Sequence, residues 1–202
     1  MNYIMNKIQE AYGYSDYQIK LIRFSFTGIL YDVSKTLIFM IFFCATGKFL
    51  EFLFAVVPLI LLRTRTGGIH FKKYLSCFLF SFVYLYAVIN ILPSVVTVHP
   101  LAIYLILLLC AVLDYMIGPA TLKDRPAAQD EFLNNLKREK TKKAKIQSFQ
   151  VVFIVAVLFF IFSDNTYLIP YLTVCFWTVV LHTVQLFITK WLKEVKYHEK
   201  LA

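Results

Sequence analysis

The chain has few of the residues that usually divide a sequence into separate domains. It contains only six glycines and six prolines in 202 residues, and no Gly/Ser/Pro-rich stretch that could serve as a flexible linker. It also has no internal repeat and no low-complexity tract. Length alone would allow one or two domains, so the missing linker predicts a single domain over residues 1–202.

Cysteine motifs and a cleavable leader are also missing. The four cysteines have neither CxxC nor zinc-ligand spacing, which argues against a disulfide framework and a metal centre. Cys44, Cys110 and Cys175 lie inside apolar runs, where a thiol usually behaves as a small hydrophobe. The first 24 residues lack the apolar core and cleavage site of a secretory signal peptide, so we expect the protein to keep them.

Apolar residues are present in excess. They make up 59% of the chain, and the mean hydropathy is +0.67, whereas a soluble domain is typically about 45–50% apolar. A helix that spans a bilayer needs about 20 residues, with a range of about 17–25. We therefore predict an all-α fold, a polytopic integral membrane protein with about six transmembrane helices. Their expected ranges are 25–46, 48–62, 74–92, 101–118, 147–163 and 168–189.

The amino terminus predicts a further, shorter helix. The apolar residues Ile4, Ile8 and Tyr12 recur at i, i+4 and i+8, a spacing typical of an amphipathic helix that lies on a membrane surface. We assign this helix to residues 2–13. A capping box of the form S-x-x-Q, beginning at Ser15, then predicts the start of a new helix.

The net charge of +9 could indicate a nucleic-acid-binding protein, but the positions of the cations argue against it. The lysines and arginines lie in short segments between apolar runs, as loop charges do in membrane proteins. Nineteen of the 21 fall in segments that the six-span topology places on one side of the membrane, whereas Lys48 falls in an outer loop and Lys35 in the first span. Under the positive-inside rule, both termini and the basic segments face the cytoplasm.

The segment between the second and third predicted spans carries the most informative residues. It reads Arg63-Thr-Arg-Thr-Gly67-Gly68-Ile-His70-Phe-Lys-Lys-Tyr-Leu-Ser-Cys77. Adjacent glycines can adopt backbone angles closed to other residues and interrupt a helix. Non-helical backbone at membrane depth must be buried in protein or line a wet cavity, which favours a pocket here.

The histidine and cysteine of this segment could form a catalytic pair. A histidine close to a cysteine can take the thiol proton and create a nucleophile. Spacing alone does not establish such a pair, because seven residues of continuous helix would separate His70 from Cys77 by about 10.5 Å along the axis. The glycine break, or a kink, must therefore fold His70 back towards Cys77.

These residues resemble the signature of the accessory gene regulator B family. Its members are membrane-embedded cysteine endopeptidases that process the precursor of a bacterial autoinducing peptide. A second block, which runs from Gly118-Pro119 to Asp124-Arg125-Pro126, is similar to the inner-loop motif of the family. Family members commonly have Asn-Lys-Pro at the end of that motif, whereas this chain has Asp124-Arg125-Pro126. The departure keeps a basic residue before the proline. Chain length, the number of predicted spans and the basic inner loop also fit, and the resemblance covers most of the chain.

The resemblance implies roles for individual residues. Cys77 would be the nucleophile and His70 its general base, with Arg63 and the Gly67-Gly68 pair supporting the site. The implied substrate is a short precursor peptide with an amphipathic amino-terminal helix, a central signal sequence that contains a cysteine, and an acidic carboxyl-terminal tail. The enzyme would remove the tail, and the signal segment would close into a thiolactone or lactone. The resemblance also implies the bacterial cytoplasmic membrane as the location and a homodimer, and no cofactor is expected.

Two further features could serve such a site. Asp114 in the fourth span could orient His70 as the third member of a triad. An acidic tail would be attracted to six basic residues that precede the fifth span, although these cations fit a purely topological role equally well. The six are Lys137, Arg138, Lys140, Lys142, Lys143 and Lys145.

The remaining intramembrane polar residues suggest structural contacts. Asp32 lies three residues before Lys35 on one helical face, which predicts an ion pair. His182 and Gln185 in the sixth span could form hydrogen bonds between helices.

Two other kinds of protein also fit the predicted architecture. A small transporter or exporter would have a similar number of spans and similar buried charges, and a non-catalytic membrane scaffold would need neither. Transport does not require a Gly-Gly-x-His…Cys block, so that block favours the peptidase. Only loss of function on substitution of Cys77 separates the peptidase from a scaffold.

The charge distribution predicts the result of a topology experiment. Reporters inserted after Lys143 and after Lys196 should lie in the cytoplasm, and a reporter after Thr97 should lie outside, because nearly all cations fall in the predicted inner segments. Labelling of the segment around residues 137–145 by an impermeant reagent added to intact cells would contradict the whole assignment.

Overall fold

A computed structural model of the chain describes residues 16–67, 74–96, 98–119 and 131–198, together with Lys7 and Gly13, and its regular elements are helices. The all-α fold class is thus confirmed. The predicted amphipathic helix at residues 2–13 lies outside the described residues, Lys7 and Gly13 apart.

Each of the six predicted spans coincides with a helical stretch. These stretches are α2 (Asp16–Ala45), α3 (Phe49–Thr66), α4 (Tyr74–Tyr86) continued by the π-helix η1 (Ala87–Ile91) and α5 (Leu92–Val95), α6 (Pro100–Ile117), α7 (Glu131–Ile161) and α8 (Ile169–His198).

Five stretches in the described part of the chain are long and apolar enough to cross a membrane. They are Phe26–Ala45, Tyr74–Val95, Pro100–Ile117, Arg138–Ile161 and Ile169–Leu192. Helix α3, which coincides with the short second predicted span, is not among them: its 18 residues include Glu51, Arg63 and Arg65. Helix α2 begins at Asp16, directly after the predicted capping residue Ser15.

Helix α7 begins much earlier than the sequence predicted. The fifth span was expected at 147–163, with the basic residues before it in a loop, but α7 starts at Glu131 and is helical through all of them. Lysine and arginine are good helix formers, and Lys143 adds an ion pair to Glu139 one turn earlier, at 2.6 Å. The basic run is therefore a helix surface, and the expectation of a loop was wrong.

The chain forms two compact units, Met1–Gly47 and Lys48–Ala202, which are described separately. The first contains α2, where Lys35 forms the predicted ion pair with Asp32 at 2.7 Å. Cys44 also lies on α2, but its side chain is exposed on the helix surface instead of being packed among other residues. The single domain predicted from the missing linker stays a prediction.

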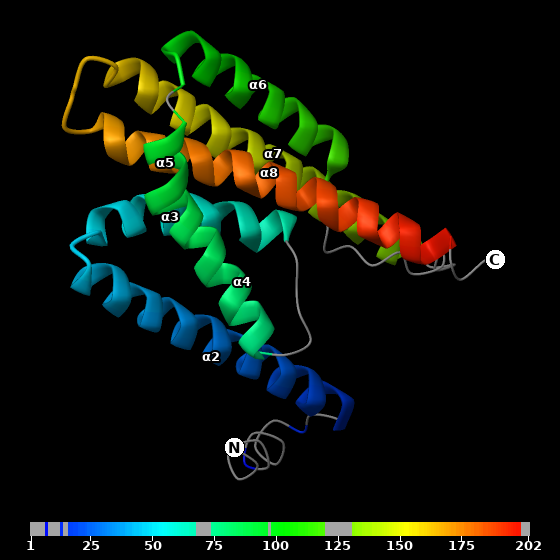
Figure 1. Cartoon of the computed structure of the whole chain (residues 1–202). Coiled ribbons are helices and arrows are strands. Elements are labelled where there is room, and N and C mark those ends of the chain that lie inside the picture. Colours follow the sequence, from blue (N-terminus) through cyan, green and yellow to red (C-terminus); the bar gives the residue numbers. More distant parts are fainter. Residues whose placement is uncertain are drawn as a thin grey trace. The chain divides into compact units, whose positions relative to one another are not determined.

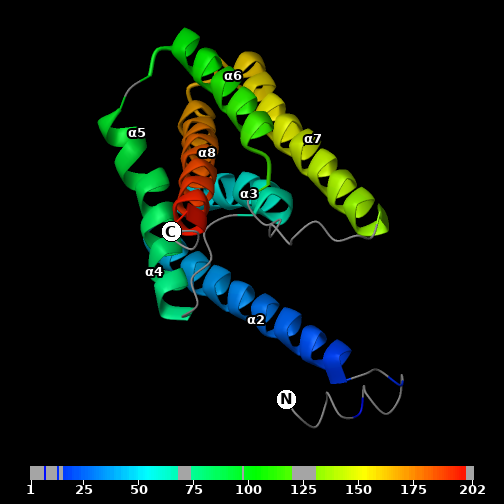
Figure 2. The ribbon, with the colours of Figure 1, turned by 90° about the vertical axis from the view of Figure 1, so that its right-hand side faces the viewer.

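In the second unit, α3, α6, α7 and α8 pack against one another, with α8 in contact with each of the other three. Figures 1 and 2 show α6, α7 and α8 side by side. Gln147 of α7 donates to the Leu61 carbonyl near the end of α3 at 2.8 Å, and Lys190 of α8 donates to the Ile117 carbonyl at the end of α6 at 3.4 Å. Helices α3, α6 and α8 therefore run in one direction and α7 in the other. We call the end at which α3 and α6 terminate, and from which α7 starts, the basic end.

The core between these helices is apolar and closely packed. Leu62, Leu107, Phe176 and Val179, from α3, α6 and α8, are each buried almost completely. Such contacts exclude water from the middle of the bundle, so every polar group inside it needs a partner supplied by the protein.

The buried Cys175 supplies one such partner. Pro58 lies inside α3 and has no N–H, so the carbonyl of Phe54 loses its usual donor within the helix. The thiol of Cys175 on α8 donates to this carbonyl at 3.1 Å. Cys175 is therefore a structural residue that joins α8 to α3.

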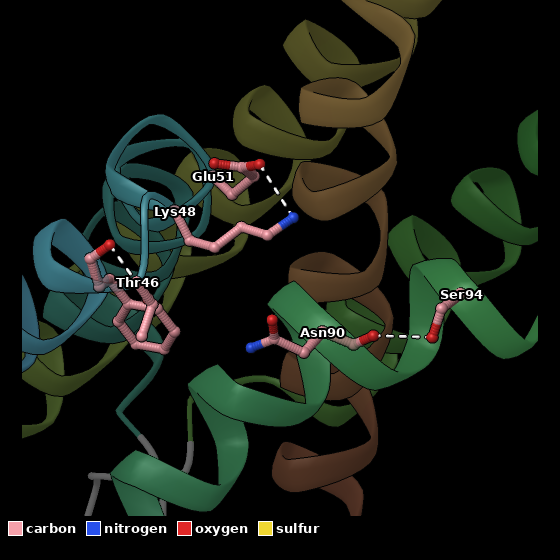
Figure 3. A network of polar contacts seen from close by, with 6 residues as sticks. Thr46, Lys48, Glu51, Asn90 and Ser94 are labelled. Atoms are coloured by element: carbon pink, nitrogen blue, oxygen red, sulfur yellow. Dashed lines mark hydrogen bonds and ion pairs between the residues drawn. The ribbon is translucent and has the colours of Figure 1, made fainter.

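Polar contacts at the opposite end of the second unit are local (Figure 3). Lys48, the cation predicted in an outer loop, pairs with Glu51 in the first turn of α3 at 3.3 Å. The hydroxyl of Ser94 donates to the Asn90 carbonyl at 2.7 Å, within the same helical stretch. These contacts stabilise helix ends without joining one helix to another.

Candidate active site at the basic end

Helix α3 ends in a backbone conformation that favours glycine. Thr66 is its last residue, and Gly67 follows with φ 78° and ψ −155°, a region in which essentially only glycine is found. The N–H of Gly67 donates to the Arg63 carbonyl at 3.0 Å and closes the last turn. The predicted helix break is thus confirmed at Gly67, whereas Gly68 lies outside the described residues.

The nucleophile candidate lies in the first turn of α4. That helix starts at Tyr74, and Cys77, its fourth residue, has a half-buried side chain. His70 lies outside the described residues, and its contact with Cys77 stays a prediction.

The end of α6 has the same backbone geometry as the end of α3. Gly118 has φ 69° and ψ −175°, and its N–H donates to the Asp114 carbonyl at 3.0 Å. Lys145 of α7 covers this turn: its ammonium group lies 4.5 Å from the centre of the Tyr115 ring, a cation–π contact. Both sequence blocks that carry the family resemblance therefore leave the bundle at its basic end through a glycine. Asp124, Arg125 and Pro126 lie outside the described residues.

Buried polar side chains of α8 hold the end of α3. His182 is completely buried, and its Nε2 lies 2.9 Å from the hydroxyl of Thr66. The predicted hydrogen bond between helices is therefore confirmed for His182. For Gln185, which is also buried, Nε2 has no hydrogen-bond partner within the part of the chain that the structure describes.

Arg63 belongs to the same polar cluster. It lies in the last turn of α3, is half-buried, and its positive charge acts on both His182 and Tyr84. Tyr84 of α4 donates its hydroxyl proton to the Thr178 carbonyl of α8 at 2.8 Å. Residues of α3, α4 and α8 thus meet close to the start of the segment that contains His70.

Asp114 lies at the end of α6 and is held by α7. Only 2% of the residue is exposed, and its Oδ2 accepts a hydrogen bond from Ser148 at 2.6 Å. Thr183 of α8 lies beside the same carboxyl group. The other oxygen, Oδ1, has no partner among the described residues. The predicted role of Asp114 in orienting His70 stays a prediction.

The basic residues of α7 differ in their surroundings. Arg138, Lys140 and Lys142 are exposed, whereas Lys143 is engaged by Glu139. Arg138 and Lys142 are four residues apart and so share one face of the helix. The side chain of Lys137 lies outside the described part of the chain.

Sequence reasoning missed several residues of this region, above all Thr66, Tyr84 and Ser148. Hydroxyl side chains are common in membrane helices, so no single one of them is a signal. Only the position of Thr66 gave a usable signal, because it lies directly before Gly67 and three residues after Arg63, whereas Ser148 lies in the middle of α7.

The fold and these residues define a polytopic helical membrane protein in which a His- and Cys-containing segment joins two helices at one end of a bundle. The sequence model of accessory gene regulator B, AgrB, matches residues 1–186, and the chain belongs to this family. Membership implies a protein that processes the precursor of an autoinducing peptide, the AgrD peptide, with which it interacts. Comparison with curated proteins and with solved structures gave no match.

The conformation of Gly67 predicts the effect of adding a single methyl group. Gly67→Ala should destabilise the protein by about 1–3 kcal/mol, because a Cβ is strained at these backbone angles, and should reduce precursor processing. Gly28→Ala is the matched control, since Gly28 lies within α2 with open space around it. Thermal unfolding in detergent and a cleavage assay measure the two effects. Equal behaviour of the two variants would show that the turn at Gly67 is not constrained.

Proposed function

We propose that the chain is a membrane cysteine endopeptidase that removes the carboxyl-terminal tail of a quorum-sensing precursor peptide. Membership of the AgrB family supplies the class of substrate. The observation that carries the proposal is the position of Cys77, half-buried in the first turn of α4 and ten residues after the constrained turn at Gly67. A reactive thiol needs this combination of access and confinement.

The chemistry proceeds by two successive acyl transfers. His70 takes the proton from the Cys77 thiol, and the thiolate attacks the scissile carbonyl of the precursor. The C–N bond then breaks, and the amine of the departing tail takes the proton from His70. The acyl-thioester on Cys77 is next attacked by the cysteine thiol of the peptide itself, which forms the thiolactone and returns Cys77 as a thiol.

The membrane setting favours cyclisation over hydrolysis. Water at the acyl-thioester would release a linear peptide and waste the intermediate, so the site has to exclude it. Exchange of one thioester for another changes the energy little, and the ring therefore forms only where the peptide thiol is the nearest nucleophile. We propose that the closely packed bundle shields the site from water in this way.

The supporting residues follow from the geometry of the basic end. The charge of Arg63, at the end of α3, is placed to stabilise negative charge that develops in the adjacent segment. Gly67 and Gly68 allow the chain to turn away from α3 towards His70. Oδ1 of Asp114, which has no hydrogen-bond partner among the described residues, can accept a hydrogen bond from the imidazole of His70 and orient it.

The tail of the precursor is proposed to bind α7. The acidic tail implied by the family resemblance is complementary to Arg138, Lys140 and Lys142, whose exposed side chains project from the first half of the helix. Lys137 and Lys145 extend the same charged stretch. The peptide's own amphipathic helix would lie on the membrane surface.

The proposed location is the bacterial cytoplasmic membrane, with both termini and the basic end of the bundle in the cytoplasm. The asymmetric distribution of lysine and arginine supports this orientation. A homodimer is proposed from the family resemblance, and we propose that the reaction needs no cofactor.

The proposal predicts which cysteine is required. Cells that express the chain with a precursor peptide should release the tail, and Cys77→Ala should release none, because the nucleophile is gone. A variant with Cys44, Cys110 and Cys175 all changed to Ala should still release it, at a level corrected for the amount of protein inserted. His70→Ala should retain very little activity.

Mass spectrometry of the released tail gives the readout for this series. Full processing by Cys77→Ala would falsify the peptidase mechanism and favour a transporter or a scaffold. Loss of activity in the triple variant with normal insertion would show that a second thiol takes part.

The proposed tail site predicts an effect on binding more than on chemistry. Changing Arg138, Lys140 and Lys142 together to Gln should raise KM by about tenfold and leave kcat almost unchanged, because the site would lose its attraction for the acidic tail. Added salt should raise KM for the unmodified protein but have less effect on this variant.

Lys143→Gln is the control for this experiment, since Lys143 is already paired with Glu139. It should change KM much less than the triple variant does. An unchanged KM in the triple variant, with topology verified, would leave these cations a topological role alone.

A further inference from the structure

We infer that His182 is a positioning residue for the catalytic segment, which it controls through Thr66. This inference rests on the proposed function, because it assigns a role to His182 in placing His70. This role requires no contact of His182 with the peptide or with Cys77. It acts by fixing the last turn of α3, from which the segment that contains His70 departs.

The hydrogen bonds around Thr66 define the direction of donation. The Thr66 hydroxyl lies 2.6 Å from the Leu62 carbonyl, to which it donates, and 2.9 Å from His182 Nε2. A hydroxyl has one proton, so Nε2 must carry the proton of the second bond. The chain of donation therefore runs from His182 to Thr66 to Leu62.

This arrangement leaves the other ring nitrogen without a partner. His182 Nδ1 is buried and has no hydrogen-bond partner within the described residues. A buried polar atom without a partner lowers the stability of the folded state. An apolar residue would avoid that cost, so the contact with Thr66 is the feature that a histidine adds at this position.

The position of Thr66 connects this contact to the catalytic segment. Thr66 is the last residue of α3, and the next residue, Gly67, has the backbone conformation available essentially only to glycine. The direction in which the chain leaves α3 is thus set within two residues. His70 follows three residues after Gly67 in the sequence, so the geometry of Thr66 and Gly67 sets where the catalytic segment begins.

Helix α8 provides a rigid support for His182. Val179 and Leu186, about one turn before and after it, are both completely buried. Cys175 on the same helix joins α8 to α3 at a second point, through the Phe54 carbonyl. A group held by packing on a well-anchored helix can position a neighbour accurately, and a misplacement of about 1 Å can cost about 100-fold in rate.

Steady-state cleavage of a synthetic precursor by the full-length protein in lipid vesicles tests the inference. Thr66→Val and His182→Leu should each lower kcat by about 10- to 100-fold with KM changed less than about twofold. Thr66→Ser, which keeps the hydroxyl, should restore kcat. In the double variant the loss should be no greater than the larger single loss, because both changes remove one contact.

Thr178→Val provides the matched control. Thr178 is on α8, one turn before His182, and is equally buried. Its hydroxyl donates to the Val174 carbonyl of its own helix, and the change to valine keeps the backbone carbonyl to which Tyr84 donates. It should leave kcat near the unmodified value. If His182→Leu does not insert, His182→Gln, whose amide can donate to Thr66, and the two Thr66 variants carry the test.

Two results would overturn the inference: kcat losses that add in the double variant, or a kcat for Thr66→Val equal to that of Thr178→Val. Failure of the proposed function has a different signature. In that case the unmodified protein would not release the tail at all, or Cys77→Ala would release it as well as the unmodified protein does.

Discussion

The second unit depends on a few hydrogen bonds by which α7 and α8 hold the ends of α3 and α6. His182 binds Thr66 and Ser148 binds Asp114, each pair buried within the bundle. A helix that ends inside a membrane protein leaves carbonyl groups and side chains that water cannot solvate. Such a helix end can exist at this depth only where neighbouring helices supply the missing partners.

This constraint explains why the candidate active site lies at the basic end. The two irregular segments that carry the family motifs both start there, at Gly67 and at Gly118. His182 and Thr183 are neighbours on α8, and they lie beside Thr66 at the end of α3 and Asp114 near the end of α6. The opposite end of the unit has local contacts such as Lys48–Glu51, which do not join helices and would not fix an irregular segment.

The proposed chemistry has the same requirement as the architecture. In the proposed mechanism, the acyl-thioester survives long enough for the peptide thiol to attack only if water is kept away. Apolar side chains such as Leu62 and Phe176 keep the interior closed. The polar residues Arg63, Thr66 and His182 lie together at its end. The exposed cations of α7 precede Ser148 on the same helix, and we propose that they attract the acidic tail.

Much of the fold could be predicted because hydrophobic runs and helix lengths follow directly from the thickness of a bilayer. The Asp32–Lys35 pair was also predictable, since its spacing lies within one helix. The extent of α7 was not, because a basic run can be either a loop or a helix surface. The bond from Thr66 to His182 joins residues 116 positions apart, and no local pattern contains that information.

The half-buried position of Cys77 and the exposed position of Cys44 also depend on packing that periodicity does not describe. Of the three cysteines inside apolar runs, Cys110 and Cys175 are buried and Cys44 is exposed. At the candidate site, the Gly-Gly-x-His…Cys block predicted membership of the accessory gene regulator B family, which the match over residues 1–186 confirms. The catalytic roles of His70 and Cys77 stay predictions.

The most direct test of the central claim is to trap the acyl-enzyme. A precursor whose own cysteine is changed to Ala lacks the thiol that would resolve the intermediate, so the protein should accumulate a peptide adduct on Cys77. Mass spectrometry of the full-length protein should show the mass of the precursor without its tail, and hydroxylamine should remove it, as it does a thioester. Tail release without any adduct, or an adduct that persists in Cys77→Ala, would contradict the account.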